Sequence, residues 1–293
     1  MIVSLAAAGS PDLPAWIGQL MLVLFLLSVV WVAWQMRAPR GMLETLGMRL
    51  ELLAGVVLRL GHLPRRRRWL AERLHVSAIK NLHVVLLVAL FIGMIVSLQT
   101  GIELARFGQQ DQIGFIVAAS MAREMGPFIT AVLLAATVGS ALAAELGTMS
   151  VSDELSALEV LSIDRVSLLV LPRVVALAIA CPLLTVLCDG VGIVGGGFVA
   201  QSQLAVGWSL YMDSVFEALQ GTAELVPVPK DVYSGLFKAF VFGAIVAVIS
   251  CACGLRAKGG ALGVGRATSQ AVRDSIIAVI IANYFLSWLI YQA

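Results

Sequence analysis

The side chains in this sequence that could most readily take part in chemistry are charged residues embedded in long apolar runs. Arg123 and Glu124 are adjacent within SMAREMGPF, and Asp189 stands alone in TVLCDGVGIVGGG. A charge at the centre of a membrane helix costs about 2.5–3.5 kcal/mol, so each of these residues needs a partner or a function. Neighbours on a helix point to different faces, so Arg123 and Glu124 are expected to meet different helices or a polar cavity. Structural pairing and substrate contact both stay open for them, and Asp189 is expected to form an inter-helix hydrogen bond.

No arrangement typical of an enzyme accompanies these charges. The stretch GALGVGRA superficially resembles a phosphate-binding loop, but Arg266 stands where that motif needs lysine and Ala267 where it needs a hydroxyl. The three histidines lie in or beside an amphipathic region, away from any nucleophile or paired carboxylates. The four cysteines lie in apolar runs and are expected to be small core residues. We therefore predict a chain that is not an enzyme and holds no cofactor or metal of its own.

An acidic segment lies between two long apolar runs, AELGTMSVSDELSALEVLSIDRVSLLVLP, within residues 144–172. Its apolar residues recur at three- and four-residue spacing and would form one stripe of a short helix opposite an acidic face. Ser150 and Asp153 have the spacing of a capping box. Two interpretations stay open: a solvated helix that only joins two spans, or a docking helix for a soluble subunit. The residues of this pattern are Val151, Leu155, Leu158 and Leu161 on the apolar side, and Asp153, Glu154, Glu159 and Asp164 on the polar side.

The composition assigns the chain to the integral membrane proteins. Hydrophobic residues make up 60% of it and charged residues 13%, with a mean hydropathy of +0.95. The net charge is only +2, and basic residues are not interleaved with aromatic ones. A nucleic-acid partner is therefore excluded.

Six segments are long and apolar enough to cross a hydrocarbon core of about 30 Å. The third has thirty-two residues and would be about 48 Å long if straight, so we expect a break at Pro127. The first would be an additional N-terminal span, followed by an interfacial amphipathic helix within Gly41–Leu63. The Arg65–Arg68 run after it is either an anionic-lipid clamp or a topology signal. The six segments are Trp16–Trp34, His83–Gln99, Ile113–Ala144, Val174–Ala200, Leu236–Leu255 and Ile276–Tyr291.

The basic residues predict the orientation of these spans. Sixteen of the twenty lie between Arg37 and Lys80, around Arg165 and Arg173, or between Arg256 and Arg273. The positive-inside rule places these segments in the cytoplasm, and the acidic segment with them. Gly192 and Gly196 have the small-x-x-x-small spacing of a close helix–helix seam, either within one chain or between two copies.

Several motifs resemble those of MlaE/YrbE-type permeases, the membrane subunits of ABC transporters that work with MCE-domain proteins. They are AELGTM, DELSALEVL, LPR and GRATSQAV, in the family's order, and the likeness covers about residues 80–292. It implies an all-α homodimer with five core transmembrane helices after an interfacial helix, in a bacterial inner membrane. The corresponding division of the chain is an N-terminal anchor (1–40), the interfacial helix with the basic cluster (41–80) and the permease domain (81–293), with a coupling helix in 145–165.

The resemblance also implies partners and site residues. The expected partners are a second copy of the chain, an ABC ATPase that binds ATP and Mg²⁺, a periplasmic MCE-domain protein, a small STAS-type accessory subunit, and a lipid. The residues matched to a lipid cavity are Leu98, Gln99, Ile102, Glu103, Arg123 and Glu124. Those matched to coupling with the ATPase are Glu145, Asp153, Glu154, Leu155, Leu158 and Glu159.

The function expected from these features is transport of phospholipids or related lipids across the cell envelope, driven by the separate ATPase. Two other functions stay open. An ion-gradient-driven carrier would use buried carboxylates such as Asp189 or Glu124 as proton relays. An assembly scaffold for the MCE partner would form complexes without moving lipid.

Overall fold

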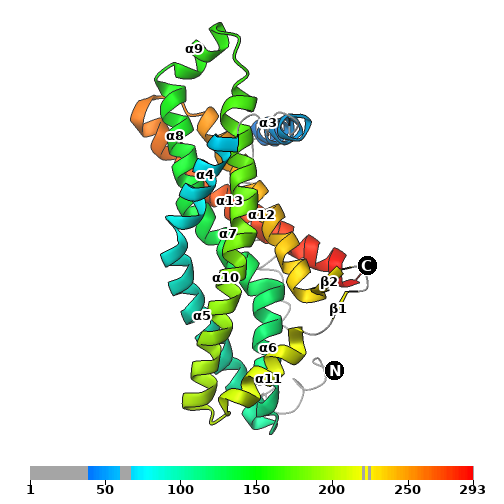
Figure 1. Cartoon of the computed structure of the whole chain (residues 1–293). Coiled ribbons are helices and arrows are strands. Elements are labelled where there is room, and N and C mark those ends of the chain that lie inside the picture. The colour runs from blue at the N-terminus through cyan, green and yellow to red at the C-terminus, as the bar shows by residue number, and fades with distance from the viewer. Residues whose placement is uncertain (1–38, 60–66, 220–221, 224–225, 293) are drawn as a thin grey trace, which may run out of the picture. The chain divides into compact units, whose positions relative to one another are not determined.

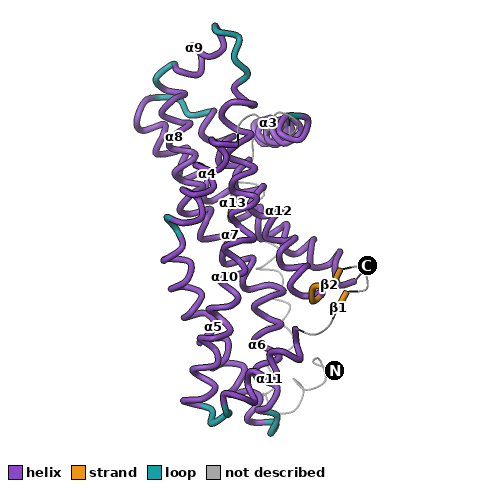
Figure 2. The backbone as a smooth tube through the Cα atoms, viewed as in Figure 1, coloured by secondary structure: helices purple, strands orange, loops and turns teal. Residues whose placement is uncertain are grey.

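The computed structural model describes residues 39–59, 67–219, 222–223 and 226–292. The chain divides into two compact units, residues 1–48 and 49–293. In the first unit only the beginning of helix α3 is described, so the predicted span Trp16–Trp34 and nearly all of the predicted domain 1–40 lie outside the described residues. The second unit is built almost entirely of helices (Figures 1 and 2).

The described elements follow one another along the chain with short connections. The helices are α3 (Pro39–Leu58), α4 (Arg67–Ile79), α5 (Leu82–Arg106), α6 (Ile113–Ser120), α7 (Gly126–Leu134), α8 (Ser140–Val151), α9 (Glu154–Val160), α10 (Leu171–Gln203), α11 (Trp208–Leu219), α12 (Lys230–Leu255) and α13 (Gly260–Gln292). A 3-10 turn, η2 (Gln110–Gln112), and three π-helical turns, η3 (Met121–Met125), η4 (Ala135–Gly139) and η5 (Val166–Val170), extend them. Strands β1 (Thr222–Ala223) and β2 (Val226–Pro229) pair antiparallel between α11 and α12.

Five helical segments in the described part of the chain are long and apolar enough to cross a membrane, which confirms the prediction of a helical, multi-pass membrane protein. The last of them begins sixteen residues earlier than predicted, at Gly260 rather than Ile276. It does so because Gly263, Ala267 and Ala271 form one buried face, while the polar residues between them point outward. The five segments are Glu72–Arg106, Gln110–Val151, Val166–Gln203, Asp231–Leu255 and Gly260–Tyr291.

The second of these segments contains the break predicted at Pro127. Its 42 residues run through α6, η3, α7, η4 and α8. The π-helical turn η3 ends where Gly126 and Pro127 begin α7, and the Gly126 N–H bonds the carbonyl of Met121. Proline has no N–H to donate, so a change in helical bonding at this point follows from the sequence. A π-helical turn also shifts the faces of the helix that follows it, and such turns are common at functional sites.

Helices α5 and α10 pack through a seam of small residues (Figure 1). A Cβ atom on Gly93 would lie 1.8 Å from the carbonyl oxygen of Gly192, so the two backbones are in direct contact. The Ser97 hydroxyl donates to the carbonyl of Gly196 at 2.8 Å. The predicted seam at Gly192 and Gly196 is therefore internal to the chain.

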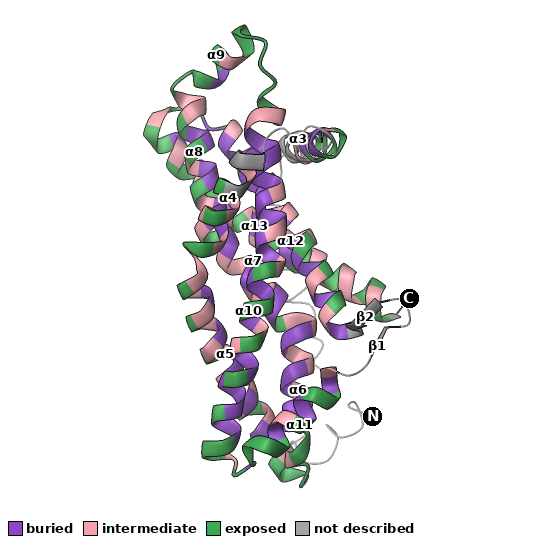
Figure 3. Ribbon diagram, in the orientation of Figure 1, coloured by how far each residue is buried: buried purple, intermediate pink, exposed green. Residues whose placement is uncertain are grey.

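Burial separates a central helix from two peripheral ones (Figure 3). In the most apolar stretch of α12, 61% of the residues are buried, against 22% for α5 and 11% for α13. From Ile277 to Tyr291, the exposed side chains of α13 are large and apolar, as expected of a surface that faces lipid or another protein. All four cysteines are buried and unpaired, as predicted.

Candidate functional site

The acidic segment forms the short helix α9, between α8 and η5 at one end of the second unit (Figure 1). Asp153 before it and Ser162 after it have φ angles of 60° and 56°, in the left-handed region. Such non-glycine conformations carry strain and are enriched at functional segments. The predicted helix of residues 145–165 is thus divided, because its first turns belong to α8 and only Glu154–Val160 form a separate helix.

The two faces of α9 differ in exposure. Leu155 is buried and Leu158 half-buried, so this part of the predicted apolar stripe packs against the molecule. Asp153, Glu154 and Glu159 are exposed, as is an apolar tip formed by Val160, Leu161 and Ile163. A surface that combines acidic groups with large exposed apolar side chains suits a protein partner.

The predicted capping box is wrong. Helix α8 continues through Val151, so Ser150 lies inside a helix instead of before one. Its hydroxyl donates to the carbonyls of Leu255 and Ala257, at 3.3 and 3.1 Å. Asp153 occupies the N-cap position of α9 without a side-chain cap bond. Ser150 therefore joins α8 to the end of α12 rather than starting α9.

Several ion pairs surround α9. Glu159 pairs with Arg165 at 2.5 Å, and Asp164 pairs with Arg59 at 2.6 Å. Glu145, one of the predicted coupling residues, lies on α8 and accepts hydrogen bonds from Arg73 and Arg173. The structure brings Asp153, Glu154, Leu155, Leu158 and Glu159 together at α9, whereas Glu145 lies apart from them, at a contact of three helices.

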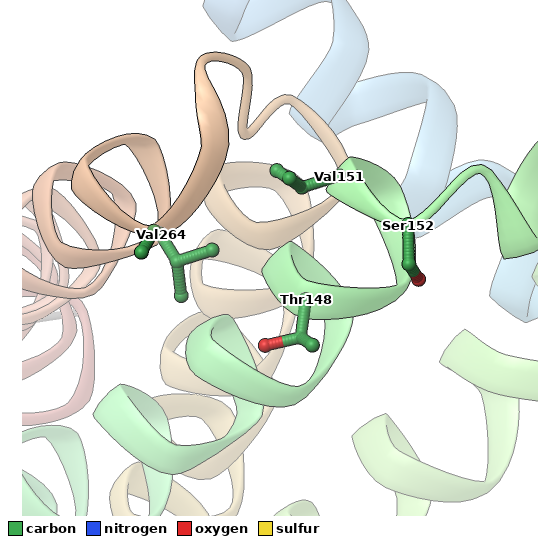
Figure 4. Close-up of a pocket in the computed structure, with 5 residues that line it drawn as sticks. Thr148, Val151, Ser152 and Val264 are labelled. Carbon is green, nitrogen blue, oxygen red and sulfur yellow. The ribbon is translucent and has the colours of Figure 1, made fainter.

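Two hollows lie beside α9. One of about 450 Å³ is mostly polar and extends from Asp153 and Glu159 of the α9 segment to Lys258, before α13, and Gly260, its first residue. The other, of about 430 Å³, is lined by Thr148, Val151 and Ser152 at the end of α8 and by Ala261 and Val264 of α13 (Figure 4). The GALGVGRA stretch forms the first turns of α13, so it is helical and does not form a phosphate-binding loop.

Glu124 lies in a polar cluster formed by three of the membrane segments. Its carboxylate accepts hydrogen bonds from Lys238 at 2.5 Å, from Ser287 at 2.8 Å and from Asn283 at 2.9 Å. The Lys238 side chain has no exposed surface, and it also donates to the carbonyl of Arg123 at 3.1 Å. Two of the three donor groups come from α13 and the ammonium from α12, so this carboxylate joins both helices to η3.

Arg123 points to a different set of partners, as its adjacency to Glu124 predicted. Its Nε lies 2.7 Å from Asp231, and its guanidinium lies 5.6 Å from the centre of the Tyr291 ring. The Tyr291 hydroxyl is 2.7 Å from that of Ser234. Sequence reasoning missed Asp231, Lys238, Asn283 and Ser287 as site residues. Lys238 had a signal, because it is a lone charge within the apolar stretch LFKAFVFG.

The remaining residues of the predicted lipid cavity lie on α5. Gln99 and Glu103 line an open, mostly apolar hollow of about 420 Å³, together with Thr100, Leu104, Phe107 and Ile116. Ile102 is exposed and Leu98 half-buried. Arg123 and Glu124 do not line this hollow, so the structure divides the predicted cavity residues into two groups.

Among the described residues, Asp189 has no partner for the inter-helix hydrogen bond that its position suggested. Its Oδ1 lies against the backbone of Gly126, close enough that a Cβ on that glycine would be 1.7 Å away. Within the described residues this oxygen is buried and has no hydrogen-bond partner. This carboxyl oxygen of Asp189 therefore packs against the start of α7.

Comparisons with known proteins identify the family of the chain. The chain matches the family model described as Permease MlaE over residues 70–289. It is 40% identical over 226 residues to a probable ABC transporter permease protein of Synechocystis sp., covering 77% of this chain and 83% of that protein. It is 37% identical over 249 residues to the chloroplast protein TRIGALACTOSYLDIACYLGLYCEROL 1 of Arabidopsis thaliana, covering 84% and 68%. A probable ABC transporter permease protein of Rickettsia bellii is 39% identical over 212 residues, covering 72% and 79%. The chain therefore belongs to the MlaE family of ABC transporter permeases.

Proposed function

We propose that this chain is the permease subunit of a transporter that moves phospholipids or related lipids across the cell envelope, driven by a separate ATPase that docks on α9. The observation that carries the proposal is the surface of α9. It presents Glu154 and Glu159 beside an exposed apolar tip, and it is directly joined to the membrane segments before and after it. The same orientation rule that places α9 in the cytoplasm puts it where ATP is available.

In this mechanism, the closing of an ATPase dimer on ATP displaces α9, and the displacement passes into α8 and α10 at either end of it. The membrane segments that contain α8 and α10 then change the shape of a cavity on the opposite side of the membrane. The chain itself contributes the lever and the cavity walls, while ATP and Mg²⁺ belong to the partner. Two copies of the permease are needed to match two ATPase subunits, and the exposed apolar face of α13 offers a surface for the second copy.

A lipid suits the hollow on α5 because its lining is mainly apolar and carries a few polar groups, among them Gln99 and Glu103. Arg123 lies outside this hollow, but its side chain is 43% exposed, so its guanidinium has surface left for a headgroup beside its contact with Asp231. The name of the Arabidopsis relative contains that of a galactolipid, which supports a lipid cargo. In a bacterial inner membrane, the outward side of the cavity would meet the periplasmic MCE-domain protein, and a STAS-type subunit would join the ATPase.

The docking role of α9 is tested by reversing its charge. The double substitution Glu154→Lys and Glu159→Lys should abolish most of the ATPase co-purification with a tagged permease, and lower nucleotide-dependent transport by about tenfold or more, a loss of at least about 1.4 kcal/mol in binding. The matched control is Asp213→Lys with Glu217→Lys, which makes the same charge change at exposed positions of α11.

The control variant should co-purify the ATPase as the unmodified chain does, and both variants should remain in the membrane fraction. Unchanged co-purification of the ATPase with the α9 variant would count against the docking role. If the unmodified complex moves no lipid although it assembles fully, the scaffold function is favoured instead.

One observation favours the ion-gradient alternative, namely the buried oxygen of Asp189 without a hydrogen-bond partner among the described residues. A proton relay would use such a carboxyl group. The two functions separate in proteoliposomes that contain a fluorescent phospholipid. Transport that needs ATP and persists when the proton gradient is dissipated supports the ATPase-driven function, whereas transport driven by the gradient without nucleotide supports the carrier.

A further inference from the structure

Glu145 joins three helices at the α9 end of the second unit. Its Oε2 accepts a hydrogen bond from Arg73 Nη1 of α4 at 2.7 Å and another from Arg173 Nη2 of α10 at 3.1 Å. Glu145 itself belongs to α8. One carboxylate oxygen therefore holds two guanidinium groups from helices that are far apart in the sequence.

This contact lies where a movement of α9 would enter the rest of the molecule. Glu145 lies in the helix that enters the α9 segment, and Arg173 lies in the first turn of the helix that leaves it. Their ion pair closes the base of the loop that carries α9. The Arg173 side chain is only 5% exposed and also donates to the carbonyl of Leu169 at 2.9 Å, so this side of the contact is firmly held.

The other side of the contact leads to the first membrane segment. Arg73 lies on α4, which together with α5 makes the continuous candidate span Glu72–Arg106. The far end of that span carries Gln99 and Glu103 at the hollow on α5. The Arg73 side chain is 29% exposed and that of Glu145 45% exposed, so solvent screens this ion pair and it can break and re-form at low cost.

A second ion pair repeats the arrangement on the other flank of α9. Arg59, directly after α3, lies 2.6 Å from Asp164, which follows α9 in the chain. Both flanks of the α9 segment are thus held by arginines that precede α5 in the chain, Arg59 directly after α3 and Arg73 within α4. The repetition indicates that these helices are tied specifically to the coupling segment.

We propose that Glu145 is a positioning residue that transmits the movement of α9 through Arg73 to α4 and α5, and does not itself contact the ATPase. The proposal rests on the proposed function, in which α9 is displaced by ATP-driven closure of the partner. In this proposal, the Arg73–Glu145 pair passes the movement of α9 on to the span that carries the hollow on α5. When that pair is lost, ATP hydrolysis continues, but the first span no longer follows.

The test compares Arg73→Gln with Arg73→Lys in the whole complex, purified through the permease and reconstituted with a fluorescent phospholipid. Arg73→Gln should lower transport per ATP hydrolysed about tenfold, while the ATPase rate stays within about twofold of the unmodified complex. Arg73→Lys keeps the positive charge and should restore most of the transport. Arg273→Gln serves as the control because that side chain is 69% exposed and its nearest acidic partner is 3.5 Å away.

A labelling experiment separates transmission from simple stabilisation. A cysteine at Gln99 would report on the hollow with little background, because the four native cysteines are all buried. Its reaction with an impermeant maleimide should change when a non-hydrolysable ATP analogue is added, and Arg73→Gln should remove this change. Adding Glu145→Gln to Arg73→Gln should leave the response to the analogue as absent as it is in Arg73→Gln alone, because the link to α4 is already broken, although the double variant also loses the contact with Arg173.

Three outcomes would overturn the inference. The first is unaltered transport by Arg73→Gln, and the second is a loss of transport and ATPase activity in parallel with a lower melting temperature. The third is loss of ATPase co-purification with Glu145→Gln, which would make Glu145 a direct docking residue. Failure of the proposed function is distinguishable from all three, because in that case the unmodified complex itself shows no nucleotide-dependent transport.

Discussion

The cluster around Glu124 and the cluster around Glu145 both pair a glutamate with basic side chains, but they differ in how far those side chains are exposed to solvent. Each consists of a glutamate from the segment Gln110–Val151 that binds basic side chains of other helices. Glu124 holds a lysine with no exposed surface and is supported by Ser287 and Asn283 as well. Glu145 is half-exposed and holds two arginines, one buried and one partly exposed.

This difference in exposure indicates which part of the molecule is rigid. A buried charge without its partner is very costly, so the Glu124 cluster fixes η3, α12 and α13 in one arrangement. An ion pair near solvent contributes about 0–1 kcal/mol, so the pairs around α9 can be exchanged during a working cycle. The proposed mechanism, in which an ATPase displaces α9, needs both properties: a rigid membrane part and an α9 segment whose contacts can rearrange.

The largest effect is expected from Lys238→Met. This substitution removes a cation with no exposed surface and leaves the Glu124 carboxylate, which is 35% exposed, unpaired. Breaking a fully buried pair costs about 3–5 kcal/mol, so we expect a loss of about 3 kcal/mol of stability here. The measurement is the thermal unfolding of the detergent-solubilised protein, together with its yield from the membrane fraction.

The double substitution Glu124→Met with Lys238→Met removes both charges and should recover much of the lost stability, because apolar replacement of a buried pair is often neutral. It also decides between the two roles left open for Glu124. A stable double variant that does not transport lipid points to a substrate contact, and one that transports normally points to structural pairing. Equal instability of the single and double variants would contradict the ion-pair account.

A smaller effect is expected at the seam of the rigid part, from Gly93→Ala. The added Cβ would lie 1.8 Å from the Gly192 carbonyl oxygen, so the backbones of α5 and α10 must separate. Overpacking of this kind costs about 1–3 kcal/mol. The control is Gly190→Ala, also within a membrane helix, where nothing lies within 4 Å of the added carbon. A lower unfolding temperature for both variants alike would show that helix flexibility, and not the seam, was lost.

The helical fold was predictable from the sequence because membrane spans are marked by unbroken apolar runs. Apolar counting placed all five described segments, but it missed the first sixteen residues of α13. In those residues small buried positions alternate with exposed polar ones. Their mean hydropathy therefore hides the buried stripe formed by Gly263, Ala267 and Ala271. The seam at Gly192 was visible from spacing, whereas its partner Gly93 depended on tertiary packing.

The candidate site was only partly predictable, because its contacts join distant parts of the chain. The sequence drew attention to Arg123 and Glu124 as buried charges, but it gave no means of assigning Asp231 and Lys238 as their partners. For Asp189 the expected hydrogen bond is not found within the described residues. A lone carboxyl group can also be accommodated by packing against a glycine, here Gly126, which no local pattern reveals.

The smallest effect is expected beside α9, from Asp164→Asn. The substitution removes the ion pair with Arg59, whose two side chains are 36% and 42% exposed, so the loss should be below about 1 kcal/mol. Asparagine can still accept the hydrogen bond that the backbone N–H of Val166 gives to Asp164 at 3.1 Å. Asp164→Ala loses that bond too and should cost about 1 kcal/mol more, the typical contribution of a capping side chain. Thermal unfolding of the two variants side by side measures the difference. A loss from Asp164→Asn as large as that from Lys238→Met would mean that the α9 end is as rigid as the membrane part, and the contrast between the two clusters would not hold.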